Sequence, residues 1–148
     1  MTFHHLLVPT DGSELSDRAV EQAVTLAGAL GARLRFLHVQ NNFPISLVGV
    51  GELVEASTIE ALVAAARHRA ETILKAAAAQ AEQAGVAAKT ATVVNPQPHQ
   101  AILAEARQHD CDLIVMASHG RHGLEGLLIG SETQRVLTHS SCAVLVVR

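Results

Sequence analysis

The chain of 148 residues contains no tryptophan and no tyrosine, and phenylalanine occurs three times. Large aromatic side chains are the platforms on which proteins stack the bases of single-stranded nucleic acids. The net charge is −3 with neutral histidines, so the chain also lacks the excess of positive charge that general DNA and RNA binders carry. Both shortages argue against a nucleic-acid partner.

Cysteine is scarce as well. Cys111 and Cys142 each stand beside an apolar run, which predicts buried free thiols and agrees with a reducing compartment. No apolar run is long enough to span a membrane. The N-terminal Met-Thr-Phe-His-His lacks the basic segment, apolar run and cleavage site of a signal peptide. We therefore expect a cytoplasmic protein that has no membrane partner.

Several motifs of catalysis and phosphate binding are missing. The absence of a Walker A motif, and of Gly-x-Gly-x-x-Gly after the first strand, excludes P-loop NTPases and standard dinucleotide dehydrogenases. Without a Gly-x-Ser-x-Gly elbow, a catalytic triad of Ser118, His119 and Asp11 is disfavoured. His119 and His122 have a metal-binding spacing, but no nearby cysteine or third histidine completes a set of ligands, and Arg121 between them opposes a cation. No metal site is predicted.

What the chain does contain is an aliphatic core pattern. Hydrophobic residues make up 49% and charged residues 17%, as in a folded protein, and the length suits one domain over residues 1–148. Apolar runs predict strands at 6–8, 33–39, 86–94, 112–117 and 143–147, and helical periodicity covers 15–30, 57–84, 98–106 and 131–139. This alternation predicts a doubly wound, Rossmann-like α/β fold, with about five parallel strands in an open sheet and helices on both faces.

The ends of the helices carry capping signals. Asp11 and Ser13 are both plausible caps of the first helix, and Gly31 suits its C-terminal stop. Residues 57–60 (Ser-Thr-Ile-Glu) and 131–134 (Ser-Glu-Thr-Gln) have the pattern of capping boxes that open the second and fourth helices. We therefore expect side chains to cap these three helix starts.

The second helix is expected to pack on the sheet along one apolar face. That face comprises Ile59, Leu62, Val63, Ala66, Ala70, Ile73, Leu74, Ala77, Ala81 and Ala84. The preceding segment, 40–56, is irregular but too apolar for a disordered linker. We expect it to pack on another surface, and its role stays open.

The most informative stretch is 112–133, which combines an apolar strand, a polar loop and a helix start. The loop and its end contain four glycines, Gly120, Gly123, Gly126 and Gly130. Free backbone N–H groups in such a loop, together with the positive end of the following helix, bind anions such as phosphate. The alternative is a tight connection whose glycines only supply positive φ angles. The loop by itself favours neither the anion site nor the plain connection.

Residues after the first two strands are suited to complete a ligand site. In doubly wound sheets, ligands bind at the carboxyl ends of the strands, where the winding reverses. If the first and fourth strands are neighbours there, residues 9–13 and 118–131 face one crevice. Asp11 would then accept hydrogen bonds from a nucleotide's sugar or base, or hold Mg²⁺, or only cap the helix. Val39 would flank an adenine or only pack in the core.

Together, these segments resemble the universal stress protein family. The resemblance rests on Pro-Thr-Asp-Gly-Ser at 9–13, on 112–121, on Gly-Ser-Glu-Thr at 130–133 and on the closing Val-Leu-Val-Val at 144–147. They occur in the family's order along the whole chain.

Nucleotide-binding members of that family carry the pattern Gly-x-x-Gly, nine residues, Gly-Ser/Thr. Gly120, Gly130 and Ser131 match it, and Ala117 replaces the first glycine. The resemblance implies that the nucleotide contacts Pro9, Thr10, Asp11, Val39, Met116, Ala117, His119, Gly120, Arg121, Gly130, Ser131, Glu132 and Thr133. Asp11 and Val39 would serve the base and sugar, and Gly120, Gly130, Ser131 and Thr133 would hold the phosphates through their N–H and hydroxyl groups.

The implied fold has strand order 3-2-1-4-5. The implied function is a stress-response protein that binds ATP or AMP as a sensor or regulator. The nucleotide would bind either alone or together with Mg²⁺. The resemblance also implies a homodimer through strand 143–147. No catalytic residue is implied. His119 is the only candidate base for a slow ATPase, which is one alternative. The other is a nucleotide-free dimeric interaction protein of the same fold.

Two residues of the stretch decide between these alternatives. Alanine at position 117 is tolerable if the backbone there is extended, because only a positive φ would require glycine. Glu132 adds a negative charge beside the expected phosphates. An outward carboxylate costs little, whereas an inward one weakens binding or requires Mg²⁺.

Overall fold

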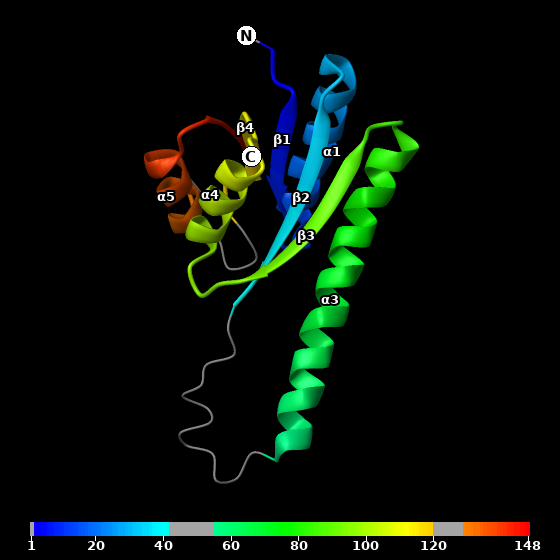
Figure 1. The fold of residues 1–148 in the computed structure, drawn as a ribbon, viewed down its shortest axis with the longest axis vertical. Helices are drawn as coiled ribbons and strands as arrows, with labels where there is room; N and C mark the ends of the chain where they lie inside the picture. The colour runs from blue at the N-terminus through cyan, green and yellow to red at the C-terminus, as the bar shows by residue number, and fades with distance from the viewer. Residues whose placement is uncertain (1, 42–54, 120–128) are drawn as a thin grey trace.

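A parallel five-stranded sheet forms the centre of the computed structural model, which describes residues 2–41, 55–119 and 129–148 (Figure 1). Its strands are β1 (His5–Pro9), β2 (Arg33–Gln40), β3 (Ala88–Val94), β4 (Leu113–Ala117) and β5 (Ala143–Val147). Their order across the sheet is β3-β2-β1-β4-β5, and every neighbouring pair is parallel. The expected fold class and strand order are confirmed.

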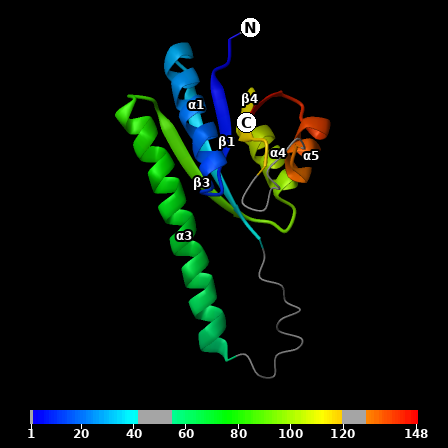
Figure 2. The ribbon, with the colours of Figure 1, turned by 180° about the vertical axis from the view of Figure 1, so that it is seen from behind.

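Helices cover both faces of this sheet. They are α1 (Glu14–Leu30), α3 (Ala56–Gln83), α4 (Pro98–Gln108) and α5 (Ser131–His139). Helices α1 and α3 lie on one face, and α4 and α5 lie on the other (Figures 1 and 2). None of the helices in the described ranges is long and apolar enough to cross a membrane.

The core consists of two aliphatic layers that share the central strand. Along β1, Leu6 and Val8 pack with α1 and α3, whereas Leu7 packs with α4 and α5. All three side chains are fully buried, as a central strand covered on both faces requires. Burial of each such side chain contributes about 1.5–3 kcal/mol. Of the two free cysteines, Cys111 is buried as expected and Cys142 is half-buried.

Most element ends follow their capping signals. Ser13 is the N-cap of α1 and accepts a hydrogen bond from the backbone N–H of Ser16 at 3.2 Å. Gly31 ends α1 with a φ of +66°, and Pro98 stands in the first turn of α4. Strand β3 begins two residues later than expected, because the N–H of Val86 still bonds to the carbonyl of Ala81 at the end of α3.

Both predicted capping boxes are wrong. Helix α3 begins at Ala56 after Glu55, which makes no side-chain cap, and the hydroxyl of Ser57 instead donates to the Glu55 carboxylate at 3.2 Å. Helix α5 has Gly130 as its N-cap, so Ser131 is its first helical residue. Helix α3 begins two residues and helix α5 one residue before its box requires, which leaves each serine inside its helix.

The first turns of α3 project beyond the sheet (Figure 1). Ile59, Leu62 and Val63 are 37%, 46% and 50% exposed, so the expectation that they pack on the sheet is wrong. The reason is that β2 is too short to reach these side chains. It ends at Gln40, whose side-chain amide donates to the carbonyl of Ala66, so the turns of α3 before Ala66 lie past the end of the strand. Residues 42–54 of the expected packing segment lie outside the described residues.

Candidate functional site

The predicted adjacency of the first and fourth strands is confirmed. Strands β1 and β4 are paired neighbours, with Leu6 opposite Leu113. Helix α1 follows β1 on one face of the sheet, and α5 follows β4 on the other (Figures 1 and 2). The winding therefore reverses between these strands, and residues 9–13 and 118–119 leave the sheet side by side.

The turn after β1 is held by its own hydrogen bonds. Pro9 ends the strand, and the buried Thr10 donates its backbone N–H to the carbonyl of Leu37 at 2.8 Å. The Thr10 hydroxyl lies 3.1 Å from that of Ser16, so it is turned into the protein. The Asp11 carboxylate accepts the N–H of Ser13 at 2.9 Å.

Sequence reasoning missed the role of His38 in this turn. Its buried ring donates from Nδ1 to the carbonyl of Thr10 at 2.9 Å, which fixes the tautomer and ties the turn to the end of β2. Its neighbour Val39 is half-buried and packs against the core layer under α4 and α5. A polar residue between the apolar Leu37 and Val39 is the only sequence signal of this arrangement.

The end of β4 answers the question about position 117. Met116 and Ala117 are buried residues of the strand, so Ala117 is extended and needs no positive φ. Beyond it, the buried Ser118 donates its N–H to the carbonyl of Val147 at 2.8 Å. The extended backbone at position 117 is the condition under which alanine can stand in place of the family's glycine.

Gly130 brings the start of α5 directly against this strand end. Its N–H donates to the carbonyl of Ser118 at 2.7 Å, and its own carbonyl accepts the N–H of Gln134. A β-carbon at Gly130 would lie 3.0 Å from that Ser118 oxygen and 3.1 Å from the β-carbon of His119. Only glycine permits this close approach without displacing its neighbours.

The first turn of α5 presents backbone N–H groups at this edge. The N–H groups of residues 131–133 have no partner four residues earlier in the helix, and Gly130 supplies no side-chain cap. Nearby, His119 has a buried Nδ1 atom that finds no hydrogen-bond partner in the part of the chain described. The Thr133 hydroxyl is already engaged, because it donates to the carbonyl of Ala117 at 3.0 Å.

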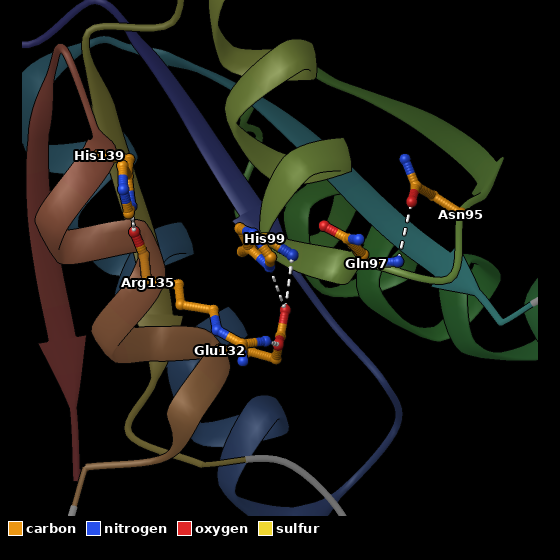
Figure 3. Close-up of polar contacts among 6 residues, drawn as sticks. All are labelled: Asn95, Gln97, His99, Glu132, Arg135 and His139. Carbon is orange, nitrogen blue, oxygen red and sulfur yellow. Dashed lines mark hydrogen bonds and ion pairs between the residues drawn. The ribbon is translucent and has the colours of Figure 1, made fainter.

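The Glu132 side chain turns toward α4 (Figure 3). One carboxylate oxygen accepts the backbone N–H of His99 at 2.7 Å and its ring Nδ1–H at 2.9 Å, and the other accepts from Arg135 at 2.7 Å. Burial alone raises the pKa of this carboxyl, but the hydrogen bonds from His99 and Arg135 outweigh burial and lower it below its ordinary value.

Gly120, Arg121 and His122 lie outside the described residues, so the expectations for them remain predictions. Within the described ranges, no three His, Cys, Asp or Glu side chains gather as metal ligands would. The described geometry therefore consists of the turn at 9–13, the end of β4 with residues 118–119, the uncapped start of α5, and one histidine nitrogen that has no partner among the described residues.

Comparison with known proteins adds relatives along the full length. The sequence profile of the Universal stress protein family matches residues 2–148. The universal stress protein YxiE of Bacillus subtilis is 34% identical over 149 residues, which cover 99% of both chains. The universal stress protein MJ0577 of Methanocaldococcus jannaschii is 30% identical over 159 residues, which cover 99% of this chain and 95% of the relative.

Solved structures agree with this assignment. The structure of MJ0577 superposes with a TM-score of 0.79 at 28% identity, covering 99% of this chain and 96% of the other. A universal stress protein crystallised in complex with cAMP superposes with a TM-score of 0.69 at 26% identity, covering 100% and 98%. With its strand order and its matching relatives, the chain belongs to the universal stress protein family.

Proposed function

We propose that this protein binds an adenine nucleotide, ATP or AMP, at the carboxyl edge of β1, β2 and β4, as a sensor or regulator in the response to stress. The phosphates would lie over the start of α5, and the base and sugar between residues 9–13 and the end of β2. A relative of the same fold is known in complex with cAMP, which is an adenine nucleotide.

The observation that carries this proposal is the open first turn of α5. Backbone N–H groups at a helix start carry partial positive charge and bind phosphate oxygens. Gly130 sets this turn against the end of β4, where the unpartnered Nδ1 of His119 supplies a further polar group. An anion with several oxygens would satisfy both features together.

The structure refines the roles proposed for individual residues. Thr133 would contribute its N–H, because its hydroxyl is bonded to Ala117. Asp11 would serve the sugar or accompany Mg²⁺, and Val39 would flank the base. The full proposed set is Pro9, Thr10, Asp11, Val39, Met116, Ala117, His119, Gly120, Arg121, Gly130, Ser131, Glu132 and Thr133.

Replacing Ser131 with proline tests the phosphate assignment. Proline removes one N–H, yet it suits the first position of a helix, and Gly130 before it has the extended ψ of 149° that a following proline favours. We expect calorimetry to show ATP affinity weakened roughly tenfold or more, because a hydrogen bond to a charged group is lost. Titrations with and without Mg²⁺ would show whether the metal accompanies the nucleotide.

The matched control is Ala56→Pro, at the first position of α3, where Glu55 has an equally suitable ψ of 143°. This variant should bind ATP as the parent does. Unchanged ATP affinity in Ser131→Pro would contradict the phosphate assignment. Absence of heat with millimolar ATP or AMP in the parent protein would overturn the proposed function and favour the nucleotide-free interaction protein.

A further inference from the structure

Glu132 creates a charge conflict at the proposed phosphate site. Its backbone N–H belongs to the open first turn of α5, while its side chain carries a negative charge on the same residue. A carboxylate directed at the phosphates would repel them, and the repulsion grows with the number of phosphate charges and with the exclusion of water. A phosphate site in this place requires the carboxylate to be held elsewhere.

The structure holds it at the start of α4. Figure 3 shows the Glu132 side chain reaching from the first turn of α5 to His99 in the first turn of α4. His99 supplies two of its donors, the backbone N–H at 2.7 Å and the ring Nδ1–H at 2.9 Å. The ring is well shielded, with 14% of its side chain exposed, so this contact is not a loose surface pairing.

The first turn of α4 is suited to receive a carboxylate from another helix. Its N-cap, Gln97, makes no side-chain cap, and the turn contains no acidic residue of its own. The N–H of Gln97 is already taken by the side chain of Asn95 at 2.8 Å, which orders the turn before the helix (Figure 3). Glu132 thus satisfies an N–H group and the positive end of α4 that α4 leaves open.

We propose that His99 is a positioning residue for nucleotide binding, which keeps the Glu132 carboxylate on α4 and away from the N–H groups that α5 offers to phosphate. This role rests on the proposed function. It predicts that loss of the His99 ring weakens ATP binding only through the charge of Glu132. The ring itself contacts no ligand in this assignment.

Four variants and two ligands test the role by calorimetry. His99→Ala removes the ring donor, and His99→Asn keeps a side-chain N–H near the position of Nδ1. The double variant His99→Ala/Glu132→Gln removes the donor and the charge together. His139→Ala is the matched control, because among the described residues the His139 ring bonds to the carbonyl of Arg135, at the other end of α5 from Glu132 (Figure 3). ATP and adenosine are the two ligands, with and without phosphate charge.

We expect His99→Ala to weaken ATP binding roughly three- to tenfold and to leave adenosine binding unchanged, since adenosine has no charge to repel. His99→Asn and the double variant should bind ATP within about twofold of the parent. Equal loss for ATP and adenosine, or no recovery in the double variant, would show that His99 is merely structural and would overturn the inference. A parent protein that binds neither ligand would instead overturn the proposed function, and the inference with it.

Discussion

At the scale of single residues, a polar side chain forms its hydrogen bond with the nearest donor or acceptor that the fold supplies. The Thr133 hydroxyl was expected at the phosphates, yet it donates to the carbonyl of Ala117. The Nδ1 atoms of His38 and His99 bond to the Thr10 carbonyl and the Glu132 carboxylate. These partners are 16, 28 and 33 residues away along the chain, so no local pattern reveals them.

The first prediction at this scale concerns Gly12, which has a φ of +75° in the turn after β1. A β-carbon there would lie 2.8 Å from the Cγ1 atom of Ile73 in α3. Gly12→Ala should therefore lose about 1–2 kcal/mol from the left-handed backbone and at least about 1 kcal/mol more from the collision. Urea unfolding followed by circular dichroism measures the loss, since the chain has no tryptophan.

Gly85→Ala is the control for this measurement. Gly85 has a similar φ of +68°, but nothing lies within 4 Å of the position its β-carbon would take. Gly85→Ala should therefore lose only the free energy that the left-handed backbone costs an alanine. If both variants lose the same free energy of unfolding, α3 does not pack against the turn as described.

At the scale of elements, helix starts are decided by what each helix lies against. Helix α5 begins after Gly130 because that residue is bonded to the end of β4, and not because Ser131 caps it. Helix α4 receives its acidic partner from α5. The capping pattern at 131–134 was a sound local signal, but the hydrogen bond of Gly130 to the end of β4 placed the start of α5 one residue earlier.

The pairing of α4 with α5 predicts a pH dependence of stability. The folded pKa of Glu132 is lowered, so its carboxylate stabilises the fold fully above its unfolded pKa of about 4.3. That contribution is lost as the pH falls through the lower folded pKa. Glu132→Gln should thus be less stable than the parent by roughly 0.5–1 kcal/mol at pH 7, and the difference should shrink below about pH 4.

Unfolding curves of both proteins between pH 7 and pH 3 provide the measurement. Glu14→Gln is a suitable control, because the Glu14 side chain is 86% exposed and its ion pair in the described part of the chain is with Arg18 on its own helix. A stability difference for Glu132→Gln that stays constant over the whole range would contradict the assignment.

At the scale of the whole molecule, β5 stands at one edge of the described sheet. Leu145 in this strand is 41% exposed. An open edge with apolar side chains is suited to pair with a second copy about a two-fold axis. We therefore keep the prediction of a homodimer through residues 143–147, the final strand.

Sedimentation at micromolar concentration tests this prediction. The parent protein should sediment as a dimer, and Leu145→Asp should shift it toward monomer, because a charge at a strand edge opposes pairing. Leu62→Asp on α3 is the matched control, with a leucine that is 46% exposed on a helix that packs on β2 and β3. A monomeric parent would refute the dimer.

The sequence by itself determined the layout of this protein. Short apolar runs that alternate with helical periodicity were enough to predict an open parallel sheet, because strands buried on both faces consist of uninterrupted apolar residues. The motifs at 9–13, 112–121 and 130–133 were enough for the strand order, by resemblance to a family. Even the tolerance of alanine at position 117 followed from its place at a strand end.

Tertiary structure alone decided where the charges and the exposed surfaces lie. The Glu132 carboxylate is bonded to His99, which reaches it because α4 and α5 share one face of the sheet. Similarly, Leu62 repeats the apolar spacing of the buried Leu74, but β2 is too short to cover it. Periodicity specifies which side of an element is apolar, whereas the length and position of its neighbours determine what that side touches.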